Sequence, residues 1–543
     1  MAARIPIGAV AATAPWNPFY PLGAPGQAVQ ALCNPAICYN MDLMDNSRID
    51  TDVLVIGGGG AGLTAAVEAR KTGADVLILC KRDTGKSGCT PYAVTNITRS
   101  TPDSEQELFR QMVEVGGYLN DQEILDVFVR EVADIVPGLQ QYGVPLSIAD
   151  GSHYHLENYP HGPQKELPGI YNVIPGPGRP LSFNLTIPLL EAARNLGVKV
   201  MDNVLVTRIL IADGCAAGAV ALDLKEGQLL IISAKAVVIA TGGSARIYER
   251  SDNPVDLTGD GFYLAFQAGA ELVNMEMMAF NPLKSTPAVL AMIKKGQPDE
   301  QLLGFGRAHY NLGGILTDTR AESTLKNLFA AGEVADGMLG AARLGGTALA
   351  DAIVFGTIAG REAGAQVSTA QRKGMPLGEV ANEMERIEGL TRGSDASAAD
   401  LQKEVKAVMW KYAGMAKTEQ SLSLARERLS QLKAVSMKVT PGNVREVGQA
   451  VEAHLMAVVG EIIAVSSLQR RETRGQFWRL DYPSSDNANC LFNVVLSRRG
   501  EGIDIRRKNV VSTRMRTPSA HPLVGCGCFN YLRPLINSKL EEG

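Results

Sequence analysis

The sequence has little net charge and no long uninterrupted apolar run. Its 53 basic and 57 acidic side chains leave a formal charge of −4, so it lacks the global basic field typical of nucleic-acid-binding chains. The most apolar stretch, 454–468, is interrupted by Glu461, and we expect a core helix there rather than a membrane span. The first 45 residues also lack the charged start and compact apolar core of a secretory signal.

Cysteine is scarce as well, with 8 residues scattered over 543 positions. This distribution does not suit a disulfide framework, and it favours a reducing, cytoplasmic compartment. Cys526 and Cys528 are separated by one residue, which is not the spacing of a zinc or iron–sulfur site. His153, His155 and His161 stand in a Pro-rich segment without metal-ligand spacing, so we predict no metal site.

What the sequence does contain is a series of short β-branched runs followed by glycine-rich turns. Residues 51–56 predict a buried strand, GGGGAG follows, a helix pattern ends at Gly73, and 74–80 predict a second strand. This is a β–turn–α–β unit of about 30 residues, typical of dinucleotide binding. A further buried strand at 236–240 and a strand followed by a turn at 327–337 place the chain in the α/β class.

Three glycines occupy the fingerprint positions of a dinucleotide site. Gly57 makes the tight turn, Gly59 lets backbone N–H groups approach a pyrophosphate, and Gly62 lets helix and strand pack closely. The helix N-terminus then faces the phosphate charge. The second strand ends at Cys80, followed by Lys81, where an acidic residue usually holds the ribose. We therefore expect backbone or a neighbouring side chain to hold the ribose.

Two later turns favour FAD over a nicotinamide cofactor. ATGG at 240–243 and AAGEV at 330–334 follow predicted strands, and FAD is long enough to need its far end held by such turns. Glu333 is a candidate hydrogen-bond acceptor for the cofactor. The alternative is a structural carboxylate that happens to follow a strand.

Five ordered motifs resemble the succinate dehydrogenase / fumarate reductase flavoprotein family, which includes L-aspartate oxidase and the adenylylsulfate reductase α-subunit. They are ATGGSARIY, LTGDGFYLAFQAGAELVNMEMMAFNP, HYNLGGI, LFAAGEVADGMLGAARLGGTALADAIVFG and ETRGQFWRLDYPSSDNANCLF. The resemblance extends from about residue 50 to about residue 496. It implies an α/β fold with a Rossmann-like FAD-binding domain, a reduced capping segment and a C-terminal helical domain.

The resemblance also implies roles for particular residues. His309 and Arg343 match the pair that binds a substrate carboxylate, for which a bidentate arginine is well suited. Covalent family members have histidine where this chain has Cys89, so a histidyl-linked flavin is excluded and we expect non-covalent FAD. A cysteinyl link is the less favoured alternative to a small buried thiol. The implied cofactor contacts are Gly57, Gly58, Gly59, Gly60, Ala61, Gly62, Lys81, Ser87, Thr90, Thr241, Gly242, Asp260, Glu333, Ala348 and Leu349.

The chain departs from the family pattern beside the substrate position. Asn281 stands where many members have histidine, and it carries no charge. Only 27 residues, 282–308, separate Asn281 from His309, where family members have a whole capping domain. In the family that domain supplies an arginine that delivers the proton. Arg307 is our candidate for this role, with a surface arginine as the equal alternative, and Arg179 and the histidines of the Pro-rich segment are other candidates.

These patterns predict the domain organisation. We expect a disordered extension at 1–45, the first part of the FAD-binding domain at 46–281 with an inserted loop at 150–183, a capping-domain remnant at 282–308, the second part of the FAD-binding domain at 309–366, a helical domain at 367–475 and a C-terminal segment at 476–543.

The expected function is that of an FAD-dependent oxidoreductase. The resemblance implies hydride transfer between flavin N5 and a carbon of a small carboxylate, as in fumarate reductase or succinate dehydrogenase. It also implies that the partner is an iron–sulfur electron-transfer subunit, with this chain cytoplasmic or peripheral to a membrane complex. One alternative is an L-aspartate-oxidase-like enzyme or a sulfur-compound reductase. A second is a flavin-bearing electron-transfer subunit without substrate chemistry.

Overall fold

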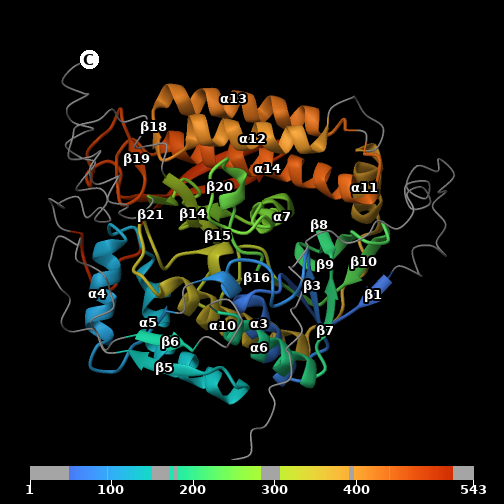
Figure 1. Cartoon of the computed structure of the whole chain (residues 1–543), viewed down its shortest axis with the longest axis horizontal. Helices are drawn as coiled ribbons and strands as arrows, with labels where there is room; N and C mark the ends of the chain where they lie inside the picture. Colours follow the sequence, from blue (N-terminus) through green and yellow to red (C-terminus); the bar gives the residue numbers. More distant parts are fainter. Residues whose placement is uncertain are drawn as a thin grey trace, which may run out of the picture.

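A parallel sheet of five strands lies at the centre of the molecule (Figure 1). Its order is β16 (Leu328–Ala330), β11 (Ala236–Ile239), β2 (Val53–Ile56), β3 (Val76–Cys80) and β7 (Lys199–Asp202). All neighbours pair in parallel, and every residue of β2, β3, β11 and β16 is buried, as expected of a parallel sheet covered on both faces. The computed structural model describes residues 48–93, 96–149, 170–174, 182–282, 306–390, 397–439 and 441–517.

The predicted β–turn–α–β unit is present around helix α3 (Gly60–Lys71), which joins β2 to the adjacent β3. Helix α10 (Thr347–Thr369) packs against α3 and also contacts β11 and β16. Alanine and glycine dominate the facing surfaces of both helices, so their backbones approach closely. The predicted α/β class is therefore confirmed, and the unit places the first residues of α3 at the carboxyl end of β2.

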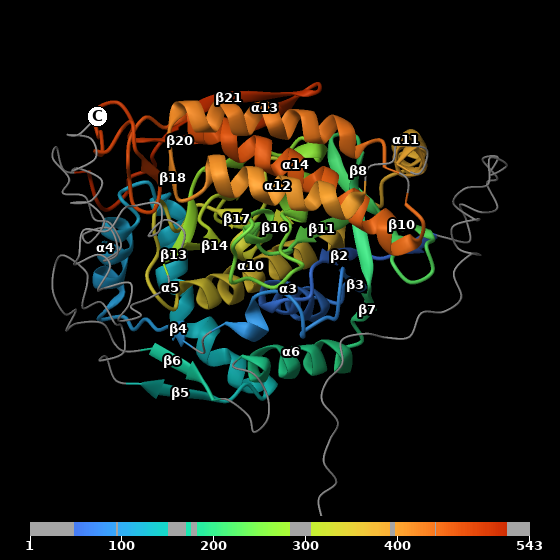
Figure 2. The same ribbon diagram turned by 45° about the horizontal axis from the view of Figure 1, so that its top comes forward.

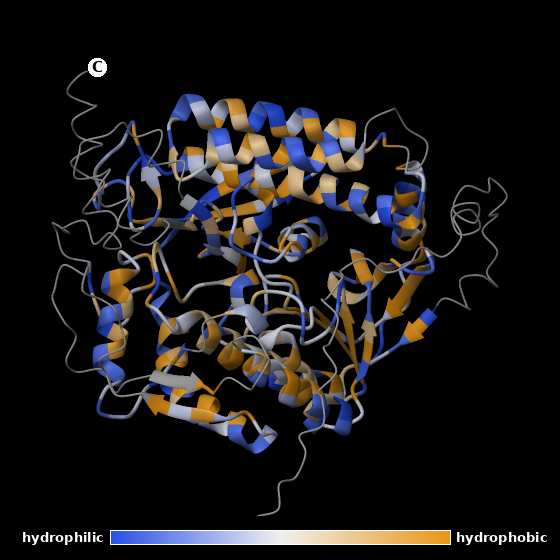
Figure 3. Cartoon of the chain, viewed as in Figure 1, coloured by the Kyte–Doolittle hydropathy of each residue, from blue (hydrophilic) through white to orange (hydrophobic). Residues whose placement is uncertain are grey.

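Three long helices lie side by side along one side of the sheet region: α12 (Ala398–Ala413), α13 (Glu419–Ser436) and α14 (Val444–Gln469) (Figures 1 and 2). Polar and apolar residues alternate along α12 and α13 (Figure 3). Within the described part of the chain, α14 is the one helix long and apolar enough to cross a membrane, but 83% of its most apolar window is buried. It packs on α12, α13 and α7 (Asp260–Ala268), as the core-helix prediction requires.

Two further sheets flank the central one. The first is β1 (Arg48–Asp50), β10 (Leu229–Ser233), β9 (Cys215–Asp223) and β8 (Val204–Ala212), in that order. The second is β17 (Ala335–Asp336), β15 (Gly314–Leu316), β12 (Leu272–Val273), β20 (Phe492–Arg499) and β21 (Gly502–Asn509), in that order. Strands near the end of the chain thus complete a sheet that begins far earlier in the sequence, at β12, which ties the C-terminal segment to the body of the fold.

Two helices, α4 (Glu105–Val115) and α5 (Gln122–Gly138), follow β4 (Asn96–Thr98) in the chain. Helix α4 ends at Gly116, and the Asp121 carboxylate caps α5 by accepting a hydrogen bond from the Glu123 N–H group. The remaining helix of the C-terminal region, α11 (Leu377–Gly389), precedes the three long helices.

The segment 150–183 is not a loop throughout, and this prediction was wrong in part. Strand β6 (Ile170–Val173) pairs antiparallel with both β4 (Asn96–Thr98) and β5 (Leu146–Ala149). The four residues of β6 favour extended structure, but the glycines and prolines on either side obscure so short a pattern. Helix α6 (Phe183–Asn195) begins at the end of the predicted loop.

Candidate active site

A cavity of about 420 Å³ opens at the carboxyl ends of the parallel strands, where α/β sheets usually bind ligands. His309 and Arg343 line it together with nearly all the predicted cofactor contacts. Gly62 is absent from the wall, because it faces the protein. The predicted contacts that line the cavity are Gly57, Gly58, Gly59, Gly60, Ala61, Lys81, Ser87, Thr90, Thr241, Gly242, Asp260, Glu333, Ala348 and Leu349.

At two positions of the glycine-rich turn a side chain would collide with a backbone carbonyl oxygen. Gly57 has φ +112°, and a Cβ there would lie 2.3 Å from the Ala240 carbonyl oxygen. A Cβ on Gly62 would lie 2.0 Å from the Gly57 carbonyl oxygen. At Gly59, in contrast, the nearest atom is the Thr90 hydroxyl at 3.4 Å, so this backbone is open to the cavity. This is the geometry that pyrophosphate binding requires.

Two hydroxyl groups help to test whether the cavity suits a polar cofactor. Thr90 accepts a hydrogen bond from the Gly60 N–H group at 3.1 Å and so holds the segment before β4 against the start of α3. Thr241 lines the cavity, and its buried Oγ1 has no hydrogen-bond partner among the described residues. That oxygen packs beside Gly261 inside the protein, so the open backbone at Gly59 is the feature of the wall that suits the pyrophosphate of a dinucleotide cofactor. The wall therefore fits FAD.

Lys81 lies at the point where an acidic residue usually follows the second strand. Its Nζ atom lies 2.8 Å from Asp260 Oδ2 and 2.9 Å from Glu452 Oε1, and it donates to Thr258 Oγ1 at 2.7 Å. Burial opposes the positive charge, but attraction to the two carboxylates outweighs it and raises the pKa of Lys81. Helices α7 and α14 thus supply the carboxylates that the end of β3 lacks, and Glu452 was not predicted from the sequence.

The proposed substrate-binding pair is in direct contact. Strand β14 (Gly306–Asn311), which pairs with β13 (Met278–Pro282), carries His309, and Arg343 lies in the turn before α10. The His309 Nε2 atom lies 3.0 Å from Arg343 Nη2, and its Nδ1 atom lies 2.9 Å from Asp252 Oδ2. Both side chains of the His309–Asp252 pair are partly accessible, at 36% and 25%.

The guanidinium of Arg343 also lies over the face of an aromatic ring. Its guanidinium carbon lies 4.4 Å from the centroid of Tyr310, whose hydroxyl donates to Asp351 Oδ2 at 3.3 Å. Burial raises the pKa of Asp351 to about 7 and that of Glu333 to about 7. Glu333 Oε1 accepts a hydrogen bond from the Asn311 N–H group at 2.9 Å, so one of its two carboxylate oxygens already has a partner within the protein.

Cys89 lines the cavity and is connected to this site through Asn253. Its Sγ atom donates to Asn253 Oδ1 at 3.0 Å, and Asn253 Nδ2 donates to the His309 carbonyl oxygen at 2.7 Å. Burial, reinforced by nearby carboxylates including Glu333, raises the pKa of the Cys89 thiol well above its usual range. The thiol is therefore neutral at physiological pH and is a poor nucleophile.

Arg307 is not brought into the cavity wall. It lies on β14 opposite Asn281, and its side chain is exposed. Residues 283–305 of the predicted capping remnant, Arg179 and the three histidines of the Pro-rich segment lie outside the described residues. Among the residues that the structure describes, no group of three His, Cys, Asp or Glu side chains could hold a metal ion.

Besides Glu452, sequence reasoning missed four residues around His309 and Arg343. Tyr310 and Asp351 stand inside the family motifs HYNLGGI and ALADAIVFG, so closer attention to those motifs could have found them. Asp252 and Asn253 lie between two motifs, in the stretch YERSDNP, and carry no pattern that marks them. Only the folded chain brings them next to His309.

Comparison with known families decides the identity of the fold. Residues 52–296 and 303–349 match the family model of the FAD binding domain, and residues 402–522 match that of the fumarate reductase flavoprotein C-terminus. The chain belongs to the FAD-binding flavoprotein family of fumarate reductase and succinate dehydrogenase. This flavoprotein is an FAD-dependent oxidoreductase, and the predictions of family, fold class and cofactor are confirmed.

Individual relatives agree with this assignment. An uncharacterized FAD-dependent oxidoreductase of Methanocaldococcus jannaschii is 29% identical over 518 residues, covering 80% of this chain and 94% of the relative. A CoM/CoB fumarate reductase chain of Methanothermobacter marburgensis is 27% identical over 550 residues, covering 84% of this chain and 99% of the relative. The fold is shared with the FrdA chain of Escherichia coli quinol fumarate reductase, at a TM-score of 0.76 and 23% identity, covering 87% of this chain and 98% of that one.

The alignment with the Methanothermobacter relative spans 550 positions, which is more than the 543 residues of this chain, yet it includes only 84% of this chain's residues. That relative therefore has segments that this flavoprotein lacks.

Proposed function

We propose that this flavoprotein transfers a hydride between FAD and a carbon of a small carboxylate substrate, in the manner of fumarate reductase or succinate dehydrogenase. The observation that carries the proposal is the contact between His309 and Arg343 on the wall of the cofactor cavity. A guanidinium offers two parallel N–H donors that match the two oxygens of a carboxylate. FAD, when bound, supplies the hydride at N5 and takes up two electrons in the reverse direction.

The chain's own residues orient the substrate. Tyr310 supports the guanidinium plane of Arg343, and His309 holds one of its nitrogen atoms, so the arginine is preorganised before any ligand arrives. A carboxylate that binds there replaces His309 as the partner of Arg343 Nη2. The glycine backbone at 57–60 lies on the same wall, where N–H groups at the start of α3 suit phosphate groups.

Arg307 stays our proposed proton donor. It lies on the same strand as His309, two residues away, and it belongs to the capping remnant at 282–308. Because its side chain is exposed and off the cavity wall, it must turn inward to donate. Replacing Arg307 with Lys should keep part of the turnover and replacing it with Gln should remove it, whereas equal turnover of the two would place the donor elsewhere.

We further propose an iron–sulfur protein as electron partner, with the flavoprotein cytoplasmic or peripheral to a membrane complex. The relatives named as subunits support a multisubunit setting. We keep the proposal that 282–308 is the remnant of a capping domain, because only 27 residues separate Asn281 from His309. The disordered extension and the other domain boundaries stay predictions.

The experiment that tests the proposal is anaerobic. FAD-loaded protein is reduced, and flavin absorbance is recorded while fumarate is added. Rapid reoxidation supports dicarboxylate reduction at this site, and the same assay on Arg343→Ala should show reoxidation lost. Unchanged turnover of Arg343→Ala would contradict substrate chemistry at this site and would favour the non-catalytic electron-transfer alternative.

A second candidate is an L-aspartate-oxidase-like enzyme or a sulfur-compound reductase. The uncharged Asn281 and the short segment after it favour a substrate other than a four-carbon diacid. This candidate predicts that fumarate fails to reoxidise the flavin while an artificial acceptor still does. L-Aspartate and adenylylsulfate are then the first compounds to add to the oxidised and reduced forms, respectively.

We propose that the FAD is held without a covalent bond. The Cys89 thiol stays protonated because burial raises its pKa, and it is already hydrogen-bonded to Asn253. Acid precipitation of the FAD-loaded protein should therefore release the flavin into the supernatant, and the peptide that contains Cys89 should have its unmodified mass. Flavin that stays with the pellet and is lost in Cys89→Ser would show a cysteinyl link instead.

A further inference from the structure

Asp252 has no role in the function proposed so far, yet it makes the closest side-chain contact of His309. Its two carboxylate oxygens lie 3.1 and 2.9 Å from His309 Nδ1, and it lines the same cavity. Asn253 Nδ2 donates to Asp252 Oδ1 at 3.0 Å and to the His309 carbonyl oxygen at 2.7 Å. A shared amide thus fixes the Asp252 carboxylate relative to the backbone of His309, and the ring is held by its own contacts to Asp252 and Arg343.

The contacts of the ring determine where its proton lies. A guanidinium can only donate, so His309 Nε2 accepts from Arg343 and carries no proton in the ligand-free site. The proton is then on Nδ1, where the Asp252 carboxylate accepts it. Both ring nitrogens are satisfied and the ring is neutral.

This arrangement changes when an anion binds. A carboxylate that occupies Arg343 faces a bare Nε2 lone pair and, behind it, the negative charge of Asp252. Both repel the ligand unless Nε2 takes up a proton from solvent. The imidazolium then donates to the ligand through Nε2–H and to Asp252 through Nδ1–H, and each charge has an opposite neighbour.

We propose that Asp252 is a positioning residue that holds His309 in the Nδ1–H form and makes it take up one proton when a carboxylate binds. The proposal rests on the carboxylate site proposed above. In the balanced step, the Arg343–His309 hydrogen bond breaks, one proton moves from water to Nε2, and an Nε2–H···O bond to the ligand forms. Hydride transfer is not part of this step.

Other titratable groups surround the pair, so a pH profile alone would not identify the proton. Burial raises the pKa values of Glu333 and Asp351 to about 7, and Cys89, Asp256 and Tyr310 also lie nearby. The readout must therefore report on the ring nitrogens of His309 directly. The chain has 6 histidines, few enough for selective labelling.

The experiment uses ¹⁵N-histidine-labelled, FAD-loaded protein, with the His309 signals assigned from their loss in His309→Gln. Malonate is the probe, because it is a short dicarboxylate without a double bond and cannot accept a hydride. We expect an Nδ1–H neutral ring without ligand, and a ring protonated on both nitrogens with malonate. A resting Nε2–H ring, or malonate bound to a ring that stays neutral, overturns the proposal.

The Asp252→Asn variant tests the carboxylate itself. An amide can donate to Nδ1, so we expect the resting ring to lose its pure Nδ1–H form. In the wild type the malonate dissociation constant should rise about tenfold per pH unit over the range in which one proton is taken up. In Asp252→Asn the dependence of the dissociation constant on pH should be weaker. At low pH its malonate dissociation constant should be at least about tenfold higher than that of the wild type, because the charge that stabilises the imidazolium is gone. An unchanged slope and tautomer would contradict the proposal.

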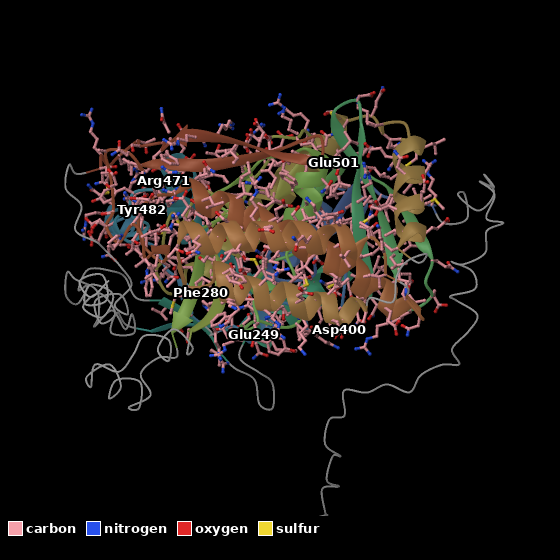
Figure 4. The ribbon with its side chains drawn as sticks, turned by 90° about the horizontal axis from the view of Figure 1, so that it is seen from above. Glu249, Phe280, Asp400, Arg471, Tyr482 and Glu501 are labelled. Atoms are coloured by element: carbon pink, nitrogen blue, oxygen red, sulfur yellow. The ribbon has the colours of Figure 1, made fainter. Side chains whose placement is uncertain are left out.

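Glu249→Gln is the matched control. It removes one negative charge from the same segment, and Glu249 is exposed and lies at the edge of the molecule (Figure 4). We expect the wild-type tautomer and the wild-type slope. If wild-type protein fails to bind malonate at any pH, the proposed carboxylate site fails, whereas the resting tautomers of the wild type and Asp252→Asn still decide whether Asp252 positions the ring.

Discussion

The guanidinium of Arg343 lies 4.4 Å from the centroid of the Tyr310 ring, and the Tyr310 hydroxyl donates to the buried Asp351. The arginine proposed to bind substrate is thus supported on a ring whose far end is anchored to α10. A flexible cation on the cavity wall would lose side-chain entropy when it binds a ligand. The stacked arrangement reduces that loss because the plane is held in advance.

Two substitutions of Tyr310 should distinguish the contribution of its ring to malonate binding from that of its hydroxyl. Tyr310→Leu removes the cation–π contact, worth about 0.5 to 2 kcal/mol, so the dissociation constant of malonate should rise roughly 2- to 30-fold. Tyr310→Phe keeps the ring under Arg343 and should bind malonate nearly as well as the wild type. Titration calorimetry of the FAD-loaded variants measures both. Equal losses in Leu and Phe would show that the hydroxyl, not the ring, supports the arginine.

The Gly62→Ala substitution should prevent cofactor binding. Its Cβ would lie 2.0 Å from the Gly57 carbonyl oxygen, so α3 must move away from the turn that faces the cofactor. Overpacking of this kind costs about 1 to 3 kcal/mol or more. The ratio of flavin to protein absorbance and the urea midpoint should both fall. Gly378→Ala in α11, where no atom lies within 4 Å of the added Cβ, should leave the flavin ratio unchanged and should not lower the urea midpoint.

Removing the charge of Lys81 should destabilise the protein strongly. Lys81→Met leaves the Asp260 and Glu452 carboxylates facing each other without their shared cation, which costs about 3 to 5 kcal/mol. The double variant Lys81→Met with Glu452→Gln should recover part of this loss. Urea unfolding measures all three proteins. Lys326→Met is the control, since it breaks a pair whose lysine is 66% exposed and should cost less than about 1 kcal/mol.

Glu333 should make the protein less stable as pH rises. Burial raises its pKa from 4.5 to about 7, so between these values the folded protein keeps a proton that the unfolded chain releases. The contribution is fully present below about pH 4.5 and is lost as pH rises through 7. It amounts to roughly 3 kcal/mol.

Glu333→Gln carries no titrating group and should flatten this part of the curve. Urea unfolding of FAD-loaded protein at several values between about pH 5 and pH 8 measures it. The slope contributed by Asp351, whose pKa is raised in the same direction, should remain in the variant. A variant as pH-dependent as the wild type would contradict the role of Glu333.

Local signals in the sequence predicted the elements and the cofactor. The alternation of buried strand, glycine turn and helix around Gly57 needs no information from elsewhere in the chain, because sterics within a few residues dictate it. β6 was missed, because four residues flanked by proline and glycine carry too little local preference and the strand depends on its partners β4 and β5.

By itself, the sequence determined the α/β class, the FAD-binding turn and the family, because each depends on residues close together in the chain or on motifs in a set order. Only the tertiary structure decided which charges meet. Lys81 contacts Glu452, and His309 contacts both Asp252 and Arg343. These residues lie far apart in the sequence, and no local sequence pattern predicts that they meet. These contacts depend on how helices and strands pack, so the electrostatics of the site emerge only when the whole chain has folded.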